Sequence, residues 1–336
     1  MRRTVRGFSG LAAGLMLMAG GARADLVAGT LYFTYFSGGA NVNDVAYNYD
    51  SSTHSFSLGA VNNLAGTNGA DGIIFAPNGN LLVGGQCSGN VYEVNPGNGN
   101  VVGSGNTLGG CSYHLALDPS GGKVYTSDFG GELKVMPLPL TNATTVTVNG
   151  GDQGVTGLAF TPGGSAYYVN GSPNGHGNVG HIDPTTGATI RLFTGLTPAH
   201  GMVFDSYTKL MTLFGDGFDA TFNPLAGSDA GIVSSLKQSQ QVTCDFDQGA
   251  VDGKGHALVA GCNQITFIDY SISGDITHPD YATSIGGFSN IDDVAPLSGL
   301  GSNNPPGGSL PEPMSLALAG LALSAALGVT GKARRR

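Results

Sequence analysis

The chain has 336 residues, of which 57 are glycine and none is tryptophan, and its formal net charge is −9 at neutral pH. An acidic chain repels the phosphate backbone of nucleic acids and anionic membrane surfaces, so we exclude nucleic acid as a partner. The body is long for one ordinary core, poor in charge and without a helical hydrophobic period, which favours a repetitive β architecture.

The N-terminal segment has the three parts of a secretory signal peptide. Three arginines lie within the first six residues, an apolar stretch covers 8–19, and a small-x-small cleavage pattern occupies 22–24. We therefore expect residues 1–24 to be removed before Asp25 by signal peptidase after export through the Sec machinery. Three apolar segments follow at 31–35, 45–50 and 55–64, and we predict them to be β-strands.

A unit of about 44 residues then repeats through the body. Each unit has a first apolar run, a turn, a second apolar run, and a third run that usually ends in Asn or Asp. The apolar anchors of the first run are spaced by 42, 43, 44 and 47 residues, at Phe75, Leu117, Phe160, Phe204 and Val251. Units of this length, made of short strands and glycine-rich turns, are typical of β-propeller blades.

The two ends of the body complement each other. Residues 291–296 match a first strand with no further strands after them, whereas the N-terminal strands lack a first strand. We therefore predict an all-β propeller over residues 25–298, with six four-stranded blades, the last of which is closed by strands from both termini. In repeat architecture alone the body resembles the six-bladed NHL and gluconolactonase-like propellers. A two-sheet sandwich is the alternative, but it does not explain the period.

Four cysteines in an exported chain are permitted to form disulfides. Three pairings exist, and closeness along the chain favours Cys87 with Cys111 and Cys244 with Cys262. All four map to loops on the face of the propeller where the inner strands begin.

Polar residues at the start of the inner strands are expected to line the mouth of the central channel. They are Asp71, Tyr113 or His114, Thr156, His200 and Asp247, with Asn290, Asp292 and Asp293 from the closing strand. We consider His114, His200, Asp71 and Asp247 as catalytic candidates, and Asp71, His200, Asp247 and Asp292 as ligands for Ca²⁺ or another divalent metal. A channel mouth filled with solvent is lined by polar residues even where it has no function, which is the alternative explanation. His200 lies four residues before its anchor and His114 three, so the two face opposite ways unless a bulge intervenes.

The other candidates are weaker. Without tryptophan, a platform for carbohydrate would use Tyr113, Tyr167, Tyr168 or Phe218. His176 and His181 are expected at the surface near a glycine-rich loop, and His256 on the opposite face.

The C-terminal tail has three parts. After a Gly- and Pro-rich linker at 299–310, Pro311, Glu312 and Pro313 precede an uncharged apolar run at 314–331, and the chain ends in Arg334, Arg335 and Arg336. An 18-residue helix spans about 27 Å, close to the thickness of a bilayer core. Residues 311–336 resemble the PEP-CTERM sorting signal, which implies a transmembrane precursor and processing by an exosortase-type enzyme.

Removing both ends takes eight of the 14 basic residues and one of the 23 acidic ones, and leaves the body at about −16. We expect a non-enzymatic cell-surface or extracellular-matrix propeller that binds exopolysaccharide, a surface protein or calcium. The alternative is a metal-dependent extracellular lactonase, lyase or hydrolase with its site at the channel mouth. A third possibility is that the tail stays as a permanent membrane anchor.

Overall fold

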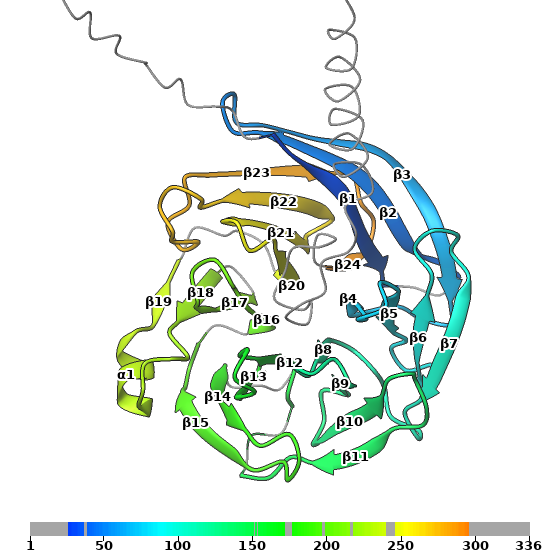
Figure 1. Ribbon diagram of the computed structural model, residues 1–336, viewed down its shortest axis with the longest axis vertical. Coiled ribbons are helices and arrows are strands. Elements are labelled where there is room, and N and C mark those ends of the chain that lie inside the picture. Colours follow the sequence, from blue (N-terminus) through cyan, green and yellow to red (C-terminus); the bar gives the residue numbers. More distant parts are fainter. Residues whose placement is uncertain are drawn as a thin grey trace, which may run out of the picture.

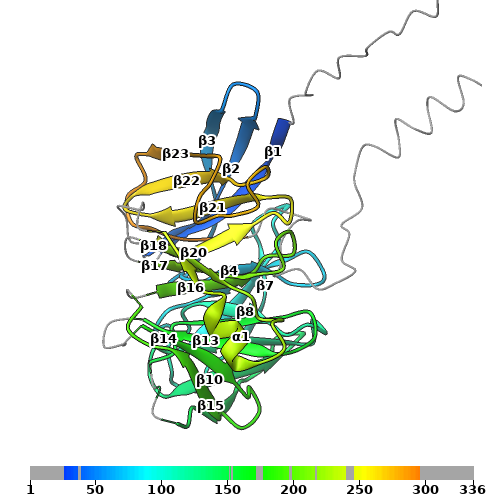
Figure 2. The same cartoon turned by 90° about the vertical axis from the view of Figure 1, so that its left-hand side faces the viewer.

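The fold is a closed ring of six four-stranded antiparallel sheets. The computed structural model describes residues 26–295, apart from 37–38, 151, 153, 172–176, 197–198, 216–217 and 240–245. The sheets surround a common centre in Figure 1, and Figure 2 shows the ring from the side. The predicted six-bladed propeller with four strands in each blade is therefore confirmed.

Blades 1 to 3 follow one another along the chain, and each runs from an inner to an outer strand. Blade 1 contains β4 (Ile73–Phe75), β5 (Leu81–Gly84), β6 (Asn90–Val94) and β7 (Val101–Asn106). Blade 2 contains β8 (Leu115–Leu117), β9 (Lys123–Ser127), β10 (Glu132–Pro137) and β11 (Thr144–Thr147). Blade 3 contains β12 (Gly157–Phe160), β13 (Ala166–Asn170), β14 (Asn178–Ile182) and β15 (Thr189–Phe193).

Blades 4 and 5 repeat this order, and blade 6 combines both ends of the body. Blade 4 contains β16 (Ala199–Phe204), β17 (Met211–Gly215), β18 (Phe218–Phe222) and β19 (Lys237–Gln238), with helix α1 (Asp229–Ser234) before its last strand. Blade 5 contains β20 (Phe246–Val251), β21 (His256–Gly261), β22 (Gln264–Asp269) and β23 (Tyr281–Gly286). Blade 6 contains β24 (Ile291–Val294), β1 (Leu26–Tyr35), β2 (Gly39–Asp50) and β3 (Ser55–Thr67).

Burial explains why the inner and outer strands differ in sequence. All residues of β4, β8 and β24 are buried, because each inner strand is covered on both faces by neighbouring blades. The outer strand β23 instead alternates between half-buried and exposed residues. Continuous apolar runs therefore mark inner strands such as β4 and β8, and a period-two pattern marks the outer strand β23.

The hydrophobic core lies between the blades. One cluster joins blades 3 and 4 through Tyr167, Phe193 and Phe222, and another joins blades 5 and 6 through Phe33 and Phe267. Apolar side chains are thus buried by the packing of one blade against the next, which stabilises the ring.

Pairing between β24 and β1 closes the ring, as the sequence predicts. Phe33 pairs with Val294, Tyr35 pairs with Ile291, and the Ala295 amide donates to the Tyr32 carbonyl at 2.8 Å. The N-terminal strands are longer than the predicted 31–35, 45–50 and 55–64, because β2 and β3 form an extended hairpin whose pairing continues through several bulges. The closure gives blade 6 its inner strand, so that β1 is paired on both sides and is not left as an edge.

No helix within the described residues is long and apolar enough to cross a membrane. The predicted signal peptide at 1–24, linker at 299–310 and sorting tail at 311–336, with its transmembrane helix at 314–331, lie outside the described residues. These assignments stay predictions.

A buried histidine cluster joins blade 5 to blade 6. His256 Nδ1 lies 2.7 Å from Asp252 Oδ2, and its Nε2 lies 3.7 Å from Asp269 Oδ1. From blade 6, the Tyr49 hydroxyl donates to Asp269 Oδ2 at 2.7 Å. Burial alone lowers the pKa of His256, but the hydrogen bond and charge of Asp252, with the charge of Asp269, outweigh burial and the repulsion of Lys254, and raise it.

This cluster makes the stability of the ring depend on pH. A raised pKa in the folded state means that the charged His256 stabilises the fold fully below the unfolded pKa of about 6.5, and that this contribution is lost as the pH rises through the folded value. We expect the loss of unfolding free energy in His256→Asn to be greatest near pH 6 and to shrink above it, as measured by urea unfolding from pH 5 to 9.

His181 provides the control, because its ion pair with Asp229 at 3.2 Å lies at the surface and contributes little. His181→Asn should follow the wild-type pH profile. A His256→Asn profile parallel to the wild type would contradict the assignment.

Candidate functional site

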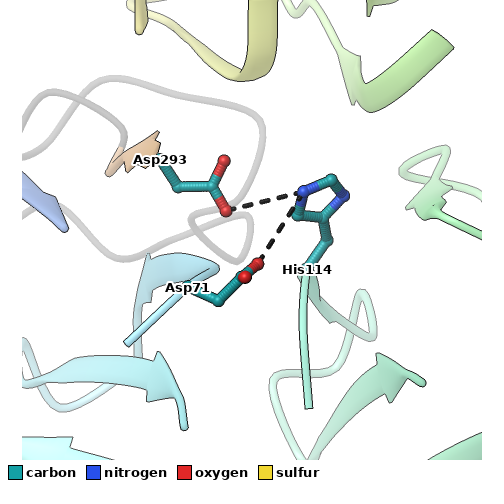
Figure 3. A group of neighbouring side chains, drawn as sticks. All are labelled: Asp71, His114 and Asp293. Carbon is teal, nitrogen blue, oxygen red and sulfur yellow. Dashed lines mark ion pairs between the residues drawn. The ribbon is translucent and has the colours of Figure 1, made fainter. Parts of the chain in front are cut away.

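The inner ends of four blades bring a histidine and four aspartates together at the centre of the ring. Asp71 precedes β4, His114 precedes β8, Asp247 lies in β20, and Asp292 and Asp293 lie in β24. Figure 3 shows the side chains of Asp71, His114 and Asp293 turned toward one another. These positions are far apart in the sequence and meet only because the ring closes.

His114 is held in one tautomer by the backbone. Its Nδ1 lies 2.8 Å from the carbonyl oxygen of Thr156, which accepts hydrogen bonds only. Nδ1 therefore carries a hydrogen and donates, and the other ring nitrogen, Nε2, is left to face the cluster. Only 5% of His114 is exposed, so its environment is protein rather than bulk water.

Three carboxylates surround the Nε2 atom of His114. It lies 2.6 Å from Asp247 Oδ1, 3.7 Å from Asp293 Oδ2 and 3.9 Å from Asp71 Oδ1. The contact with Asp247 is close, but its geometry is not that of a hydrogen bond, and neither of the two atoms has a hydrogen-bond partner. The nitrogen thus faces three carboxyl groups and lies closest to that of Asp247.

His200 reaches the same aspartate because its strand is irregular. The register of β16 against β17 shifts between Ala199 and Gly201, and His200 Nδ1 lies 3.5 Å from Asp247 Oδ1. The opposite orientation expected of a regular strand does not occur, because the shift at His200 turns its side chain. Both histidines therefore converge on Asp247.

The closing strand supplies two adjacent carboxylates. Asp293 Oδ1 accepts a hydrogen bond from the Gln248 amide at 2.8 Å, which leaves Oδ2 directed at His114. Asp292 is buried and lies close enough to Asp71, Asp247 and Asp293 to interact electrostatically with all three. The buried oxygens Oδ2 of Asp292 and Oδ2 of Asp293 have no geometrically well-formed hydrogen bond.

The carboxyl groups of the cluster differ in the direction of their pKa shifts. Burial and the charge of Asp293 raise the pKa of Asp71 well above its usual value, and burial with the charge of Asp247 raises the pKa of Asp293 to about 7. Burial and the charge of Asp71 likewise raise the pKa of Asp292. Burial also acts to raise the pKa of Asp247, but His114 and His200 outweigh it and hold the value far below normal.

The pKa of His114 is also shifted by its neighbours in the cluster. Burial acts to lower the pKa of His114, but Asp293, Asp247 and Asp71 together raise it well above its usual value. Such a set of coupled acids and bases can bind a cation, or can donate and accept protons.

A second network supports the loop that carries Thr156. Asp152 is 2% exposed and accepts hydrogen bonds from Arg191, from the Tyr168 hydroxyl and from Asn178 Nδ2 at 2.8 Å. Burial acts to raise the pKa of Asp152, but these donors outweigh it and lower the value. The loop before β12 is thereby fixed, and with it the carbonyl that orients His114.

An aromatic pair stands beside the cluster. Tyr113 and Phe129 are half-buried and stack with ring centroids 4.2 Å apart, and Phe129 also meets the His114 ring edge-on at 5.6 Å. Phe129 has a φ of 58°, a conformation that costs a bulky residue of order 1–3 kcal/mol and is often found at functional sites. The sequence pointed to Tyr113 but not to Phe129, whose only signal is an aromatic residue before a Gly-Gly pair.

The structure corrects part of the predicted carbohydrate platform. Tyr167 and Tyr168 are 1% and 0% exposed, because they lie in β13 between blades and pack into the core. The side chain of Phe218 lies outside the described residues, as does His176. His181 is partly exposed, as expected, and Asn290 pairs with the loop at Asn263 rather than with the cluster.

The predicted disulfide between Cys87 and Cys111 is present. It joins the loop after β5 to the loop before β8, and Cys87 Sγ lies 3.3 Å from the Tyr113 hydroxyl. The second predicted pair, Cys244 with Cys262, includes Cys244, which lies outside the described residues. That pair stays a prediction.

Comparisons with known proteins show the fold alone. No family model and no curated protein matches the sequence. A chain in a crystal structure of a nidogen/laminin complex is 12% identical, with a TM-score of 0.59 over 80% of this chain and 98% of that one. The Myceliophteria thermophila Cps50 (Swd1) β-propeller domain is 11% identical, with a TM-score of 0.52 over 81% of this chain and 91% of that one.

The disulfide at the mouth should contribute measurably to stability. Its two cysteines are 24 residues apart, and a loop of this size corresponds to about 3 kcal/mol in the chain-entropy account. We expect the double substitution of Cys87 and Cys111 by serine to lower the unfolding free energy by about that amount in urea titrations. Adding a reducing agent to the double variant should cause no further loss of stability at this pair. An unfolding free energy equal to that of the wild type would contradict the prediction and would show that the bond only fixes the local loops.

Proposed function

We propose that this protein is an exported β-propeller, sorted through a PEP-CTERM tail by an exosortase-type enzyme and retained at the cell surface or in the extracellular matrix as a binding module. The propeller fold is consistent with a binding or structural role. The observation that supports export best is the Cys87–Cys111 disulfide, because such bonds persist in oxidising compartments. The signal-peptide pattern at 1–24 supports export, and the Pro-Glu-Pro motif at 311–313 supports sorting by an exosortase-type enzyme.

The binding surface that we propose is the mouth of the channel. Tyr113 and Phe129 offer an aromatic surface against which the C–H face of a sugar ring can pack. Asp247, whose side chain is one-quarter exposed, can accept a hydrogen bond from a hydroxyl group. The strained φ of Phe129 supports this choice, because the fold keeps an unfavourable conformation at this point. The ligand class is therefore a polyhydroxylated polymer such as the cell's own exopolysaccharide.

Processing of the tail is tested by the intact mass of the protein recovered from the cell surface and from the medium. We expect an N-terminus at Asp25 and a C-terminus near 311–313, because the sorting enzyme removes the apolar and basic segments. A variant with alanine at all three positions 311–313 serves as the control and should keep its full tail. Recovery of the wild type with its arginine-rich end intact would show a permanent membrane anchor instead.

Ligand binding is tested by co-sedimentation with the insoluble exopolysaccharide of the producing cell. We expect Tyr113→Ala to weaken retention about 10-fold or more, since an aromatic contact is worth roughly 1–3 kcal/mol when it packs on a ring. Tyr207→Ala is the matched control, because Tyr207 is an exposed tyrosine in the turn between β16 and β17, at the opposite end of the strands. Equal loss in both variants would contradict a site at the mouth.

One observation keeps a second function open. His114 and His200 converge on Asp247, within reach of three further carboxylates, which is the arrangement expected of a metal-dependent lactonase, lyase or hydrolase. Metal-dependent turnover of a lactone, an ester or an acidic polysaccharide by the purified protein would place it in this class. The structural comparisons support neither function over the other, because they show the fold alone and give no information on the site.

A further inference from the structure

Among the described residues, histidines are the cationic partners of the four carboxyl groups at the channel mouth. His114 and His200 form ion pairs with members of this group, and no lysine or arginine does so with Asp71, Asp247, Asp292 or Asp293. Buried carboxyl groups this close together repel one another when they are ionised, and a bound cation would allow them to ionise together.

The orphaned atoms show where such a cation would lie. His114 Nε2 and Asp293 Oδ2 are buried, face each other at 3.7 Å and lack hydrogen-bond partners. Asp71 completes a group whose ligand atoms all lie within 4.8 Å of one another. Two ligands bound at about 2.1 Å to one ion are separated by about 3 to 4 Å, which agrees with the observed spacing of His114 from both aspartates.

The second shell also fits a metal ligand. A metal-binding histidine usually donates its other N–H to a carbonyl or carboxylate, as His114 Nδ1 does to Thr156. Asp293 is likewise fixed by the Gln248 amide through Oδ1, so that only Oδ2 is available. Neither feature is required by a polar but inert channel mouth.

We propose that Asp71, His114 and Asp293 bind one divalent transition-metal ion at the mouth of the channel. Asp247, whose Oδ1 lies 2.6 Å from His114 Nε2 and whose side chain is one-quarter exposed, provides a third carboxylate on the open side. One imidazole with carboxylates suits Zn²⁺ or Mn²⁺, whereas Ca²⁺ prefers six to eight oxygen ligands. The Ca²⁺ option suggested by the acidic composition is therefore the weaker one. The inference deepens the proposed binding function, since the ion would sit beside Tyr113 and could fix the hydroxyl groups of a bound polymer.

The test uses the exported, mature protein, stripped with a chelator and then titrated with Zn²⁺, Mn²⁺ or Ca²⁺ alone. We expect one equivalent of Zn²⁺ or Mn²⁺ by calorimetry and by metal analysis after gel filtration, and Ca²⁺ binding at least 100-fold weaker. Asp293→Asn and His114→Gln should each weaken Zn²⁺ binding about 100-fold or more. His181→Gln, which alters a surface histidine–aspartate pair, should bind like the wild type.

Folding of the variants is checked independently. Asp293→Asn removes one of the repelling carboxylates, so the metal-free variant should melt no lower than the metal-free wild type, and lost binding cannot then be ascribed to unfolding. Zn²⁺ should raise the melting temperature of the wild type only. Substoichiometric binding by the wild type, or equal affinity in wild type and Asp293→Asn, would overturn the site and leave a protonated His114 as the partner of the carboxylates. Retention on exopolysaccharide and the mass of the mature protein are measured separately, so failure of the metal site would leave the proposed function standing.

Discussion

Pairing of β24 with β1 is the interaction on which both the fold and the site depend. The pairing brings the last strand of the body beside the N-terminal strands, and the Thr34 hydroxyl ties them together by donating to the Asp71 carbonyl at 2.7 Å and accepting from the Asp293 amide at 3.2 Å. The same contact that closes the ring thus places Asp293 next to Asp71. A propeller that failed to close would lose two of its four clustered carboxylates along with the packing of blade 6.

The burial of these carboxylates opposes folding, and the rest of the ring offsets it. Each inter-blade interface buries large apolar side chains, whereas the carboxyl groups of the mouth cluster lie at the inner ends of a few strands. The buried cluster at His256 differs, because its charged groups are compensated by partners within the protein. There one histidine and two aspartates are compensated by Tyr49 and by backbone donors, including the Ser271 amide at 3.0 Å from Asp269. The contrast suggests that the mouth cluster is left uncompensated for binding, while the cluster at His256 serves stability.

The sequence predicts the architecture well because the architecture depends on periodic features. The anchors from Phe75 to Val251 recur at nearly equal spacing, and the unmatched strand at 291–296 requires a partner at the other end of the body. Both features follow from the burial of inner strands on two faces, which any sequence of this fold must satisfy. The number of blades and the composition of the sixth blade are therefore predictable from the sequence.

The site could be predicted only in part, because its geometry depends on departures from the repeat. Residue counting placed His114 and His200 on opposite sides, and only the register shift in β16 brings both toward Asp247. Tyr167 and Tyr168 look like an exposed aromatic pair in the sequence, but they occupy a second strand that is covered on both faces. Phe129 lies in a loop whose conformation is set by a positive φ, which no pattern of hydrophobicity encodes.

These departures indicate how a repetitive fold acquires a single site. Six similar blades present six similar strand beginnings to the channel, yet blade 3 contributes the Thr156 backbone carbonyl, whereas blades 1, 2, 4, 5 and 6 contribute side chains. An ion or ligand at the centre of the ring is bound by only a few side chains. Six identical blades would present six copies of the same side chain there, which is more than one ion or ligand can contact. Chemistry at the mouth therefore depends on how the blades differ, while stability depends on how they agree.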